Sequence, residues 1–381
     1  MIFPIEDLKK QDTPCYYYDL QLLRRTLTSL NAEIAGWPYY VHYAVKANAN
    51  PLLLNEIRQA GLGVDCVSGW EVQRVVENGF SPEKIVFAGV GKTDKEINYA
   101  LDNDIFCFNV ESLPELEVID QLAAQKCKVA KVAIRINPNI DAHTHKYITT
   151  GLNENKFGIT LDMLDGVINR ALELKNVSLE GIHFHIGSQL TDMSPYKMLC
   201  DTINELLTNL ESKGVMLKIV NVGGGLGIDY DNPDEHEVPD FAGFFSIFKT
   251  RLQLRQGQQL HFELGRSIVA QCGALITRVT FVKEAKVKKF AIVDAGMSDL
   301  IRPALYQAHH KIQNLTGDDN VTCRYDVVGP ICESSDCFGE DELLPKVTRG
   351  DLLAIRSAGA YGEIMASRYN CRPFANVFVK Q

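Results

Sequence analysis

Lys46 is the residue of this sequence with the clearest capacity for chemistry. It ends a short apolar stretch within Tyr43-Ala-Val-Lys-Ala-Asn48, which has the character of a strand end. A lysine whose surroundings favour the neutral amine is a nucleophile that forms imines with carbonyl compounds. The ordinary alternative is a lysine whose methylene chain follows an apolar strand while its ammonium group reaches solvent. The residues that accompany Lys46 have to decide between the two.

Other polar residues end, or lie on, further apolar segments of strand length: Asp65, Arg135, His183, His185 and Glu263. In a barrel of parallel strands the active site forms at the carboxyl ends of the strands, so we expect these side chains to gather around Lys46. Each of them has an ordinary explanation when it is taken singly. Taken together, they favour a catalytic site.

The run Gly223-Gly-Gly-Leu-Gly227 follows another apolar segment. Consecutive glycines let backbone N–H groups converge on an anion, most often a phosphate, and a plain glycine turn is the alternative. Glu263 could hold a heterocycle nitrogen protonated, as proteins do for pyridoxal phosphate, or it could pair with Arg266. His185 could stack on the same ring while Ser188 reaches the phosphate. A core histidine and a turn serine are the alternatives.

His183 and His185 also raise a different possibility. Two histidines at positions i and i+2 of a strand point to one face and could bind zinc, as in a barrel hydrolase. Such a site would need a third histidine and a carboxylate at other strand ends. A lysine, a glycine run and an arginine stand there instead, which favours the first interpretation.

The composition is that of a globular protein of two or three domains. Of 381 residues, 46% are hydrophobic and 23% charged, and the net charge of −9 argues against a nucleic-acid or anionic-membrane partner. The ten cysteines form no C-x-x-C pair, which is typical of free thiols in a reducing compartment. The first ten residues lack a signal-peptide pattern and no segment is long enough to span a membrane, so we expect a cytoplasmic protein.

Apolar runs alternate with amphipathic helical patterns and predict eight strands: 39–44, 63–66, 85–88, 105–109, 129–136, 179–184, 219–222 and 261–263. Eight strand–helix units in about 240 residues are typical of a (β/α)8 TIM barrel. After Ser267 the pattern becomes rich in β-strands. We therefore predict a barrel domain over residues 25–267 and an all-β domain over 268–381, which residues 1–24 could join.

In these motifs the chain resembles the diaminopimelate decarboxylase family of fold-type III pyridoxal phosphate enzymes, which is akin to alanine racemase. The resemblance runs nearly end to end. Besides the Lys46 motif, the glycine run and Glu263–Arg266, it is carried by five further segments: His185–Gln189, Asp294–Met297, Ile301–Tyr306, Gly329–Asp336 and Gly359–Gly362. One departure is Leu264, where the family usually has proline, and we expect it to affect local geometry rather than chemistry.

The resemblance implies pyridoxal 5'-phosphate as the cofactor and a role for each matching residue. Lys46 would carry the cofactor, His185 would stack on its ring, Glu263 would pair with the ring nitrogen, and Cys332 would donate a proton. Further contacts with the cofactor would come from Asp65, Arg135, Ser188, Gly224, Gly225, Gly265, Arg266 and Tyr361. The substrate would be bound by Arg266, Arg302, Tyr306, Glu333 and Tyr361.

The expected reaction is the decarboxylation of meso-2,6-diaminopimelate to L-lysine. A thiol suits the final protonation because its ordinary pKa, near 8.5, leaves a proton available at neutral pH; a small buried hydrophobe is the alternative for Cys332. Two arginines, Arg266 and Arg302, favour a substrate with more than one carboxylate. Decarboxylation of ornithine, arginine or lysine is the alternative activity, and an inactive cofactor-binding relative is the alternative outside catalysis.

The expected site residues fall in both predicted domains. Lys46, His185 and Glu263 belong to the barrel, whereas Cys332 and Tyr361 belong to the β domain. The resemblance implies that the β domain of one subunit completes the barrel site of its partner, so a homodimer with two shared sites is expected.

Overall fold

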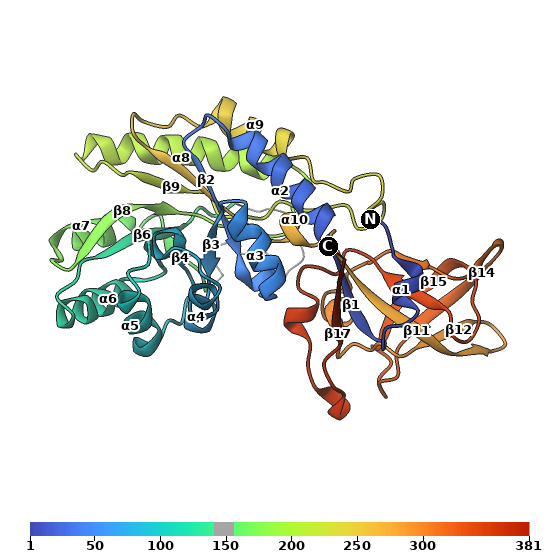
Figure 1. Ribbon diagram of the computed structural model, residues 1–381. Coiled ribbons are helices and arrows are strands. Elements are labelled where there is room, and N and C mark those ends of the chain that lie inside the picture. The colour runs from blue at the N-terminus through green and yellow to red at the C-terminus, as the bar shows by residue number, and fades with distance from the viewer. Residues whose placement is uncertain (141–155, 381) are drawn as a thin grey trace. The chain divides into compact units, whose positions relative to one another are not determined.

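The chain forms two compact units in this computed structural model, which describes residues 1–140 and 156–380 (Figure 1). The first unit consists of Leu27–Gly227 and Asp240–Gly265. The second consists of Met1–Thr26, Ile228–Pro239 and Arg266–Gln381. Within the described residues, no helix has the length and apolar character needed to cross a membrane.

Eight parallel strands form the centre of the first unit: β2 (Tyr39–Ala44), β3 (Gly63–Cys66), β4 (Ile85–Phe87), β5 (Cys107–Val110), β6 (Ala130–Asn137), β8 (Val177–His183), β9 (Ile219–Asn221) and β10 (Gln259–Leu264). Pairing of β10 with β2 and of β5 with β6 closes the ring, and β7 (Ile159–Thr160) adds to β6 outside it. The predicted (β/α)8 barrel is thus confirmed. All eight predicted strands are present, with ends that differ from the prediction by no more than two residues.

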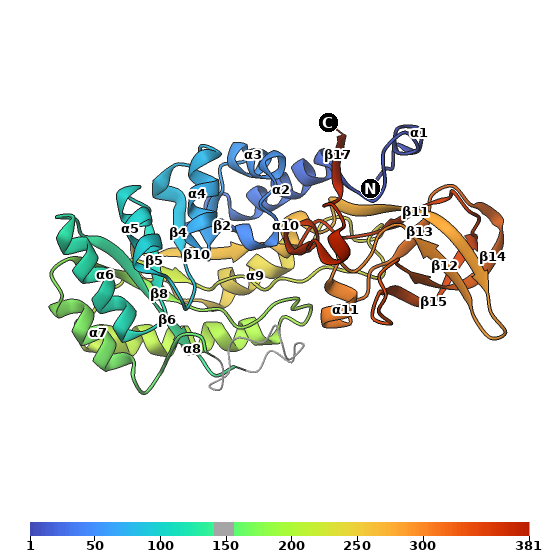
Figure 2. The same ribbon diagram turned by 90° about the horizontal axis from the view of Figure 1, so that it is seen from below.

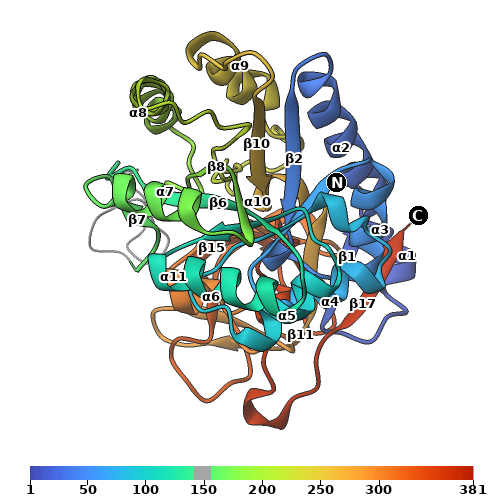
Figure 3. The ribbon, with the colours of Figure 1, turned by 90° about the vertical axis from the view of Figure 1, so that its left-hand side faces the viewer.

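Helices surround this barrel, as the view along it in Figure 3 shows. They are α2 (Leu20–Ile34), α3 (Pro51–Gln59), α4 (Gly69–Glu77), α5 (Asp94–Asp102), α6 (Leu113–Gln125), α7 (Leu164–Glu173), α8 (Ser194–Ser212) and α9 (Phe241–Arg251). Several begin at a side-chain cap; Thr93, for example, forms a capping box with Glu96. In those helices the cap fixes the point at which the chain passes from the preceding strand into the helix.

The pleat of strand β10 places an apolar packing residue on one face and polar residues on the other. Phe262 points outward, where its ring lies 4.9 to 5.8 Å from three phenylalanine rings of α9. Its neighbours His261 and Glu263 point to the opposite side, which is the barrel interior. A single strand therefore anchors the helical layer and carries an acidic group into the barrel.

The second unit is a mostly antiparallel, nearly closed β-barrel. Its strands are β1 (Cys15–Asp19), β11 (Gly273–Glu284), β12 (Lys289–Val293), β13 (Ile312–Asn314), β14 (Asp318–Val328), β15 (Cys337–Lys346), β16 (Leu352–Ile355) and β17 (Asn376–Lys380). Figure 2 shows the curved strands β11, β12, β14 and β15. β1 pairs with β11 and with β17, so the N-terminal strand belongs to this sheet. The short helices are α1 (Ile5–Leu8), α10 (Arg266–Val269) and α11 (Arg302–Tyr306).

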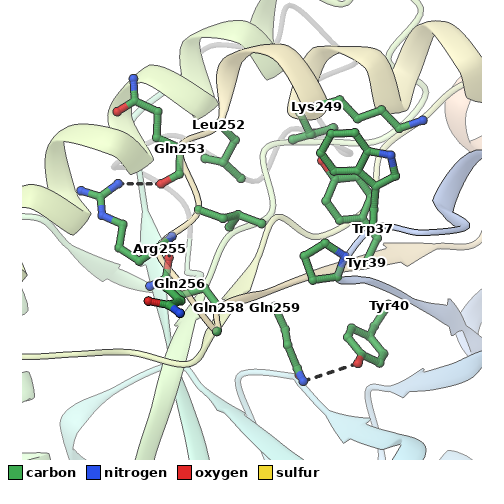
Figure 4. A pocket seen from close by; sticks show the side chains of 14 residues that line it. Trp37, Tyr39, Tyr40, Lys249, Leu252, Gln253, Arg255, Gln256, Gln258 and Gln259 are labelled. Atoms are coloured by element: carbon green, nitrogen blue, oxygen red, sulfur yellow. Dashed lines mark hydrogen bonds between the residues drawn. The ribbon is translucent and has the colours of Figure 1, made fainter.

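An open groove of about 530 Å³ lies in the first unit, between the segments 37–40 and 252–259 (Figure 4). It is found where β2 and β10 begin, because Tyr39 and Gln259 are their first residues. Lys46 follows the opposite end of β2. Active sites of such barrels form at the carboxyl ends of the strands, so this groove is not the candidate site.

Candidate active site

Lys46 lies in a single 3-10 turn, Val45–Ala47, directly after β2. Its Nζ is 3.8 Å from Oδ2 of Asp65 on β3, and 38% of its side chain is exposed. Asp65 is fully buried, and neither of its carboxylate oxygens accepts a hydrogen bond within the described structure. Burial and the nearby Glu263 raise the pKa of Asp65 well above its ordinary value. The site thus holds a reachable amine beside a carboxyl group whose hydrogen-bonding capacity is unused.

Glu263, near the carboxyl end of β10, has the opposite environment. Its Oε1 accepts hydrogen bonds from Nδ2 of Asn109 at 2.9 Å and of Asn221 at 2.8 Å, and its Oε2 accepts one from Nε2 of His183 at 2.9 Å. β5 and β10 are not neighbours in the ring, so the bond from Asn109 crosses the barrel interior. Although burial opposes ionisation, His183, Lys46 and the hydrogen bonding lower the pKa of Glu263 far below its ordinary value. Glu263 is therefore the ionised member of this pair of carboxyl groups.

His185 follows β8 and is held by the glycine run. The backbone N–H of Gly224 donates to His185 Nδ1 at 3.2 Å, which places the ring's hydrogen on Nε2. Burial, Lys46 and Arg135 lower the pKa of His185 well below its ordinary value, so the imidazole is neutral. A neutral, fixed imidazole can offer its flat face to another ring.

The glycine run permits a close approach of strand ends that no side chain would allow. A Cβ on Gly224 would lie 2.0 Å from the carbonyl oxygen of Glu263, and one on Gly225, at φ +109°, would lie 2.7 Å from that of Gly187. Three N–H groups of the run already have partners within the protein: Gly224 donates to His185 Nδ1, Gly223 to Oδ1 of Asn221 and Gly227 to the carbonyl of Leu190. The expected phosphate contact of Gly224 would thus require its N–H to exchange partners.

Arg135, near the end of β6, forms an ion pair with Glu111 that balances its charge. Its Nη1 donates to Oε1 of Glu111 at 2.6 Å, and its guanidinium lies 4.7 Å from the centre of the Phe157 ring. The other oxygen of Glu111 accepts the backbone N–H of Gly158 at 2.9 Å. Arg135 is therefore fixed beside the strand ends, near enough to His185 to influence its pKa.

The two histidines that we weighed as zinc ligands have other partners: His183 bonds to Glu263 and His185 to Gly224. Among the residues that the structure describes, no three His, Cys, Asp or Glu side chains are grouped to hold a metal ion.

Two further expected cofactor residues also lie after strands. Ser188 lies in the loop after β8, and Gly265 directly follows β10, where a Cβ would come 3.1 Å from those of Ala44 and Ala47.

The second unit brings two of the expected substrate residues together. Arg266 of α10 and Arg302 of α11 are both buried, and both donate to the hydroxyl of Tyr230, at 2.6 and 2.7 Å. The guanidinium of Arg266 also lies 4.8 Å from the ring centre of Tyr361. Tyr306 ends α11, and it raises the pKa of Arg266 together with Tyr230 and Tyr361, against the effect of burial. These side chains form a concentrated centre of positive charge.

Cys332 and Glu333 lie on the loop between β14 and β15, and both are exposed. Glu333 accepts hydrogen bonds from the hydroxyls of Tyr369 and Ser335. The buried Asp336 shapes this loop, since its Oδ2 accepts the N–H of Ile331 at 2.6 Å and its Oδ1 that of Met297 at 2.6 Å. An accessible thiol next to a carboxylate is thus presented by a well-held loop.

Four further residues make these contacts and were not predicted from the sequence: Asn109, Asn221, Glu111 and Tyr230. The two asparagines lie at strand ends, and that position was a signal that could have identified them. Glu111 directly follows β5. Tyr230 comes three residues after the glycine run, and nothing in the sequence indicates that its hydroxyl meets two arginines.

The first unit's residues fit pyridoxal phosphate. The cofactor's aldehyde needs an accessible lysine, its ring needs a carboxylate and a flat neighbour, and its phosphate needs a backbone approach that side chains do not block. Lys46, Glu263, His185 and the glycine run have these properties. The unused oxygens of the buried Asp65 mark a polar place that the protein alone does not fill.

Comparison with known proteins agrees with this chemistry. The family model of the pyridoxal-dependent decarboxylase pyridoxal-binding domain matches residues 20–270. The diaminopimelate decarboxylase of Bacteroides thetaiotaomicron is 60% identical over 97% of this chain and 96% of its own length. That of Vibrio cholerae is 44% identical over 97% of this chain and 88% of its own.

Solved structures agree as well. The Helicobacter pylori diaminopimelate decarboxylase complexed with L-lysine superposes with a TM-score of 0.93 at 39% identity, covering 99% of this chain and 94% of that one. A lysine/ornithine decarboxylase of Vibrio vulnificus reaches a TM-score of 0.85 at 22% identity over 99% and 97%, which shows a shared fold only. The extent of these matches and the lysine-centred site lead to one conclusion: the chain belongs to the diaminopimelate decarboxylase family of pyridoxal phosphate-dependent decarboxylases.

Proposed function

We propose that Lys46, Glu263 and His185 hold pyridoxal phosphate and that Cys332 and the two buried arginines act on the substrate. The reaction is the family's: diaminopimelate loses CO2 and becomes lysine, the last step of lysine biosynthesis. The observation that carries this assignment is Glu263, an ionised carboxylate held by three hydrogen bonds among the strand ends that also bear Lys46. When bound, the cofactor supplies an electron sink for the carbon that loses CO2.

The first unit's residues bind and orient. Lys46 would hold the cofactor covalently, and Glu263 would keep its ring nitrogen protonated. His185 would stack on the ring, and the phosphate would lie near Ser188 and Gly225. Asp65, Arg135, Gly224, Gly265 and the second unit's Arg266 and Tyr361 would complete the surroundings.

The second unit's residues would recognise the substrate and move a proton. Arg266 and Arg302 suit carboxylates because guanidinium groups bind them bidentately, and Tyr306 and Tyr361 would line the same place. Glu333 would bind the distal ammonium. Cys332 would donate the proton that replaces CO2. An ornithine-type substrate lacks a second carboxylate for Arg302, and the relative with that activity resembles this chain in fold only.

The assignment of Lys46 can be tested by labelling. The purified protein should absorb visible light, and borohydride reduction followed by peptide mapping should place the label on Lys46. Lys46→Ala should remove both the label and the CO2 release from meso-diaminopimelate. A colourless protein, or a label on another lysine, would show that the assignment is wrong.

We also propose a cytoplasmic homodimer with two shared sites, because the cofactor residues and Cys332 fall in different domains. The proposed division is 25–267 against 268–381 with residues 1–24; the compact units differ from it by placing 25–26, 228–239 and 266–267 with the β-strands. Mixing inactive Lys46→Ala and Cys332→Ala subunits should restore activity. Random exchange gives about half heterodimers with one intact site each, hence roughly a quarter of wild-type activity. No recovery after demonstrated subunit exchange would contradict the shared site.

A further inference from the structure

Tyr230 stands between two buried cations. Its hydroxyl oxygen is 2.6 Å from Nη1 of Arg266 and 2.7 Å from Nη1 of Arg302. The exposed fractions of the three residues are 9%, 6% and 5%. The guanidinium carbons of Arg266 and Arg302 lie 5.9 and 4.9 Å from the centre of the Tyr230 ring, so the cations meet both its oxygen and its π system.

The hydrogen bonds leave the phenolic O–H of Tyr230 without an acceptor among the described residues. A guanidinium only donates, so the oxygen of Tyr230 accepts from both arginines and its two acceptor positions are filled. The ring of His310 meets that of Tyr230 edge-on, with 5.0 Å between centres. Its Nε2, however, accepts the N–H of Arg302 at 3.1 Å, while its Nδ1–H donates to the carbonyl of Arg356. Among the described residues, no acceptor for the Tyr230 proton is found.

The local charge favours loss of that proton. Arginine stays protonated at any ordinary pH, and two buried cations need a counter-charge. Burial and Arg302 lower the pKa of His310 to about 3, so it adds no charge. Tyr361 and Tyr306, which also raise the pKa of Arg266, are phenols. Although burial opposes it, the two arginines lower the pKa of Tyr230 below its ordinary value.

We propose that Tyr230 is a positioning residue that acts as a phenolate, serving as the counter-anion of Arg266 and Arg302 and holding both guanidinium groups ready for a carboxylate. When a carboxylate reaches the arginines it supplies a second negative charge. Tyr230 then takes one proton from solvent and becomes a neutral phenol, while the total charge of the cluster is kept. This second half rests on the proposed role of the arginines in substrate binding; the phenolate itself does not.

The phenolate is tested by following tyrosinate absorbance in the holoenzyme during a pH titration. The wild type should show one tyrosinate that forms below the ordinary range near pH 10, and Tyr230→Phe should lack it. Tyr17→Phe is the matched control, since this buried phenol of the same unit donates to the carbonyl of Ile2 at 2.9 Å and burial raises its pKa. Equal curves for the wild type and Tyr230→Phe below pH 10 would overturn the proposal.

Should Tyr230→Phe fail to fold, NMR of the wild type labelled at the tyrosine Cζ replaces it. The chain has 14 tyrosines, and one resonance should have the shift of an ionised ring at pH 8. A spectrum in which all 14 are neutral would overturn the phenolate.

The competition is tested with pimelate, a dicarboxylate that has no amine and cannot react with the cofactor. Its binding, measured by calorimetry, should be accompanied by uptake of about one proton and loss of the tyrosinate signal. Binding without proton uptake would overturn the competition. If the tyrosinate signal appears as predicted but pimelate does not bind, the result contradicts the role of the arginines in carboxylate binding. The proposal that Tyr230 is a phenolate is then unaffected.

Discussion

The two compact units organise opposite charges in opposite ways. In the barrel, one carboxylate, Glu263, is kept ionised by neutral amide donors and an imidazole that converge from different strands. In the β unit, two cations, Arg266 and Arg302, share the oxygen of one phenol. The first arrangement suits a protonated ring nitrogen, and the second suits carboxylates. The difference agrees with the proposal that the barrel supplies most of the cofactor contacts and the β unit most of the substrate contacts.

Removing a cation from the β unit is the strongest test of this division. Arg302→Ala should lower kcat/KM for diaminopimelate by an amount equivalent to about 2 to 5 kcal/mol of transition-state free energy. This is the range for truncating one partner of a buried charge pair. Arg324→Ala is the control, because this arginine of the same unit is exposed and pairs with the exposed Asp341. Steady-state kinetics of both variants measure the difference. Wild-type kcat/KM in Arg302→Ala would refute the substrate assignment.

Neutralising the carboxylate of the barrel tests the other half. Glu263→Gln keeps the shape but loses the charge, so it should lower kcat by about 10² to 10³, the range for losing one preorganised electrostatic contact. It should also release pyridoxal phosphate faster on dialysis. Glu180→Gln is the matched control, since Glu180 lies on β8 and pairs with Lys218 at 2.9 Å. If both variants kept wild-type kcat, Glu263 would have no electrostatic role.

The sequence predicted the barrel well because its strands are short apolar runs separated by capped helices, and that pattern is local. It also predicted that Lys46, Glu263 and the glycine run lie at strand ends, as they do, while their roles stay predictions. It could not predict that Asn109 reaches Glu263 across the barrel, because that contact depends on ring closure between strands 154 residues apart. Tyr230 was missed for the same reason: both arginines that meet it are distant in sequence.

The barrel interior also contains a buried pair of histidines, His42 and His261, whose protonation should depend on pH. His42 Nδ1 lies 3.3 Å from the carbonyl oxygen of Lys84, its Nε2 lies 2.8 Å from Nδ1 of His261, and one hydrogen bond links the two rings. Burial lowers the pKa of His42 to about 4 and that of His261 well below its ordinary value. Both rings are therefore neutral near pH 7, and charging either one would place an ionised group in the buried barrel interior.

This pair leads to the prediction with the smallest expected effect. A histidine whose pKa is lowered on folding binds more protons when unfolded, so the stability it contributes is complete above pH 6.5 and declines toward pH 4. For His42 alone the free energy of unfolding should fall by about 2 kcal/mol between pH 7 and pH 5. Urea unfolding at several pH values should therefore show a shallower dependence in His42→Asn than in the wild type. His309→Asn, which changes an exposed histidine paired with Asp231, should keep the wild-type slope. Parallel slopes for all three proteins would mean that His42 already carries a proton in the folded barrel or is reached by water. The contrast between a barrel with neutral donors and a cationic β unit would then not hold for this pair of histidines.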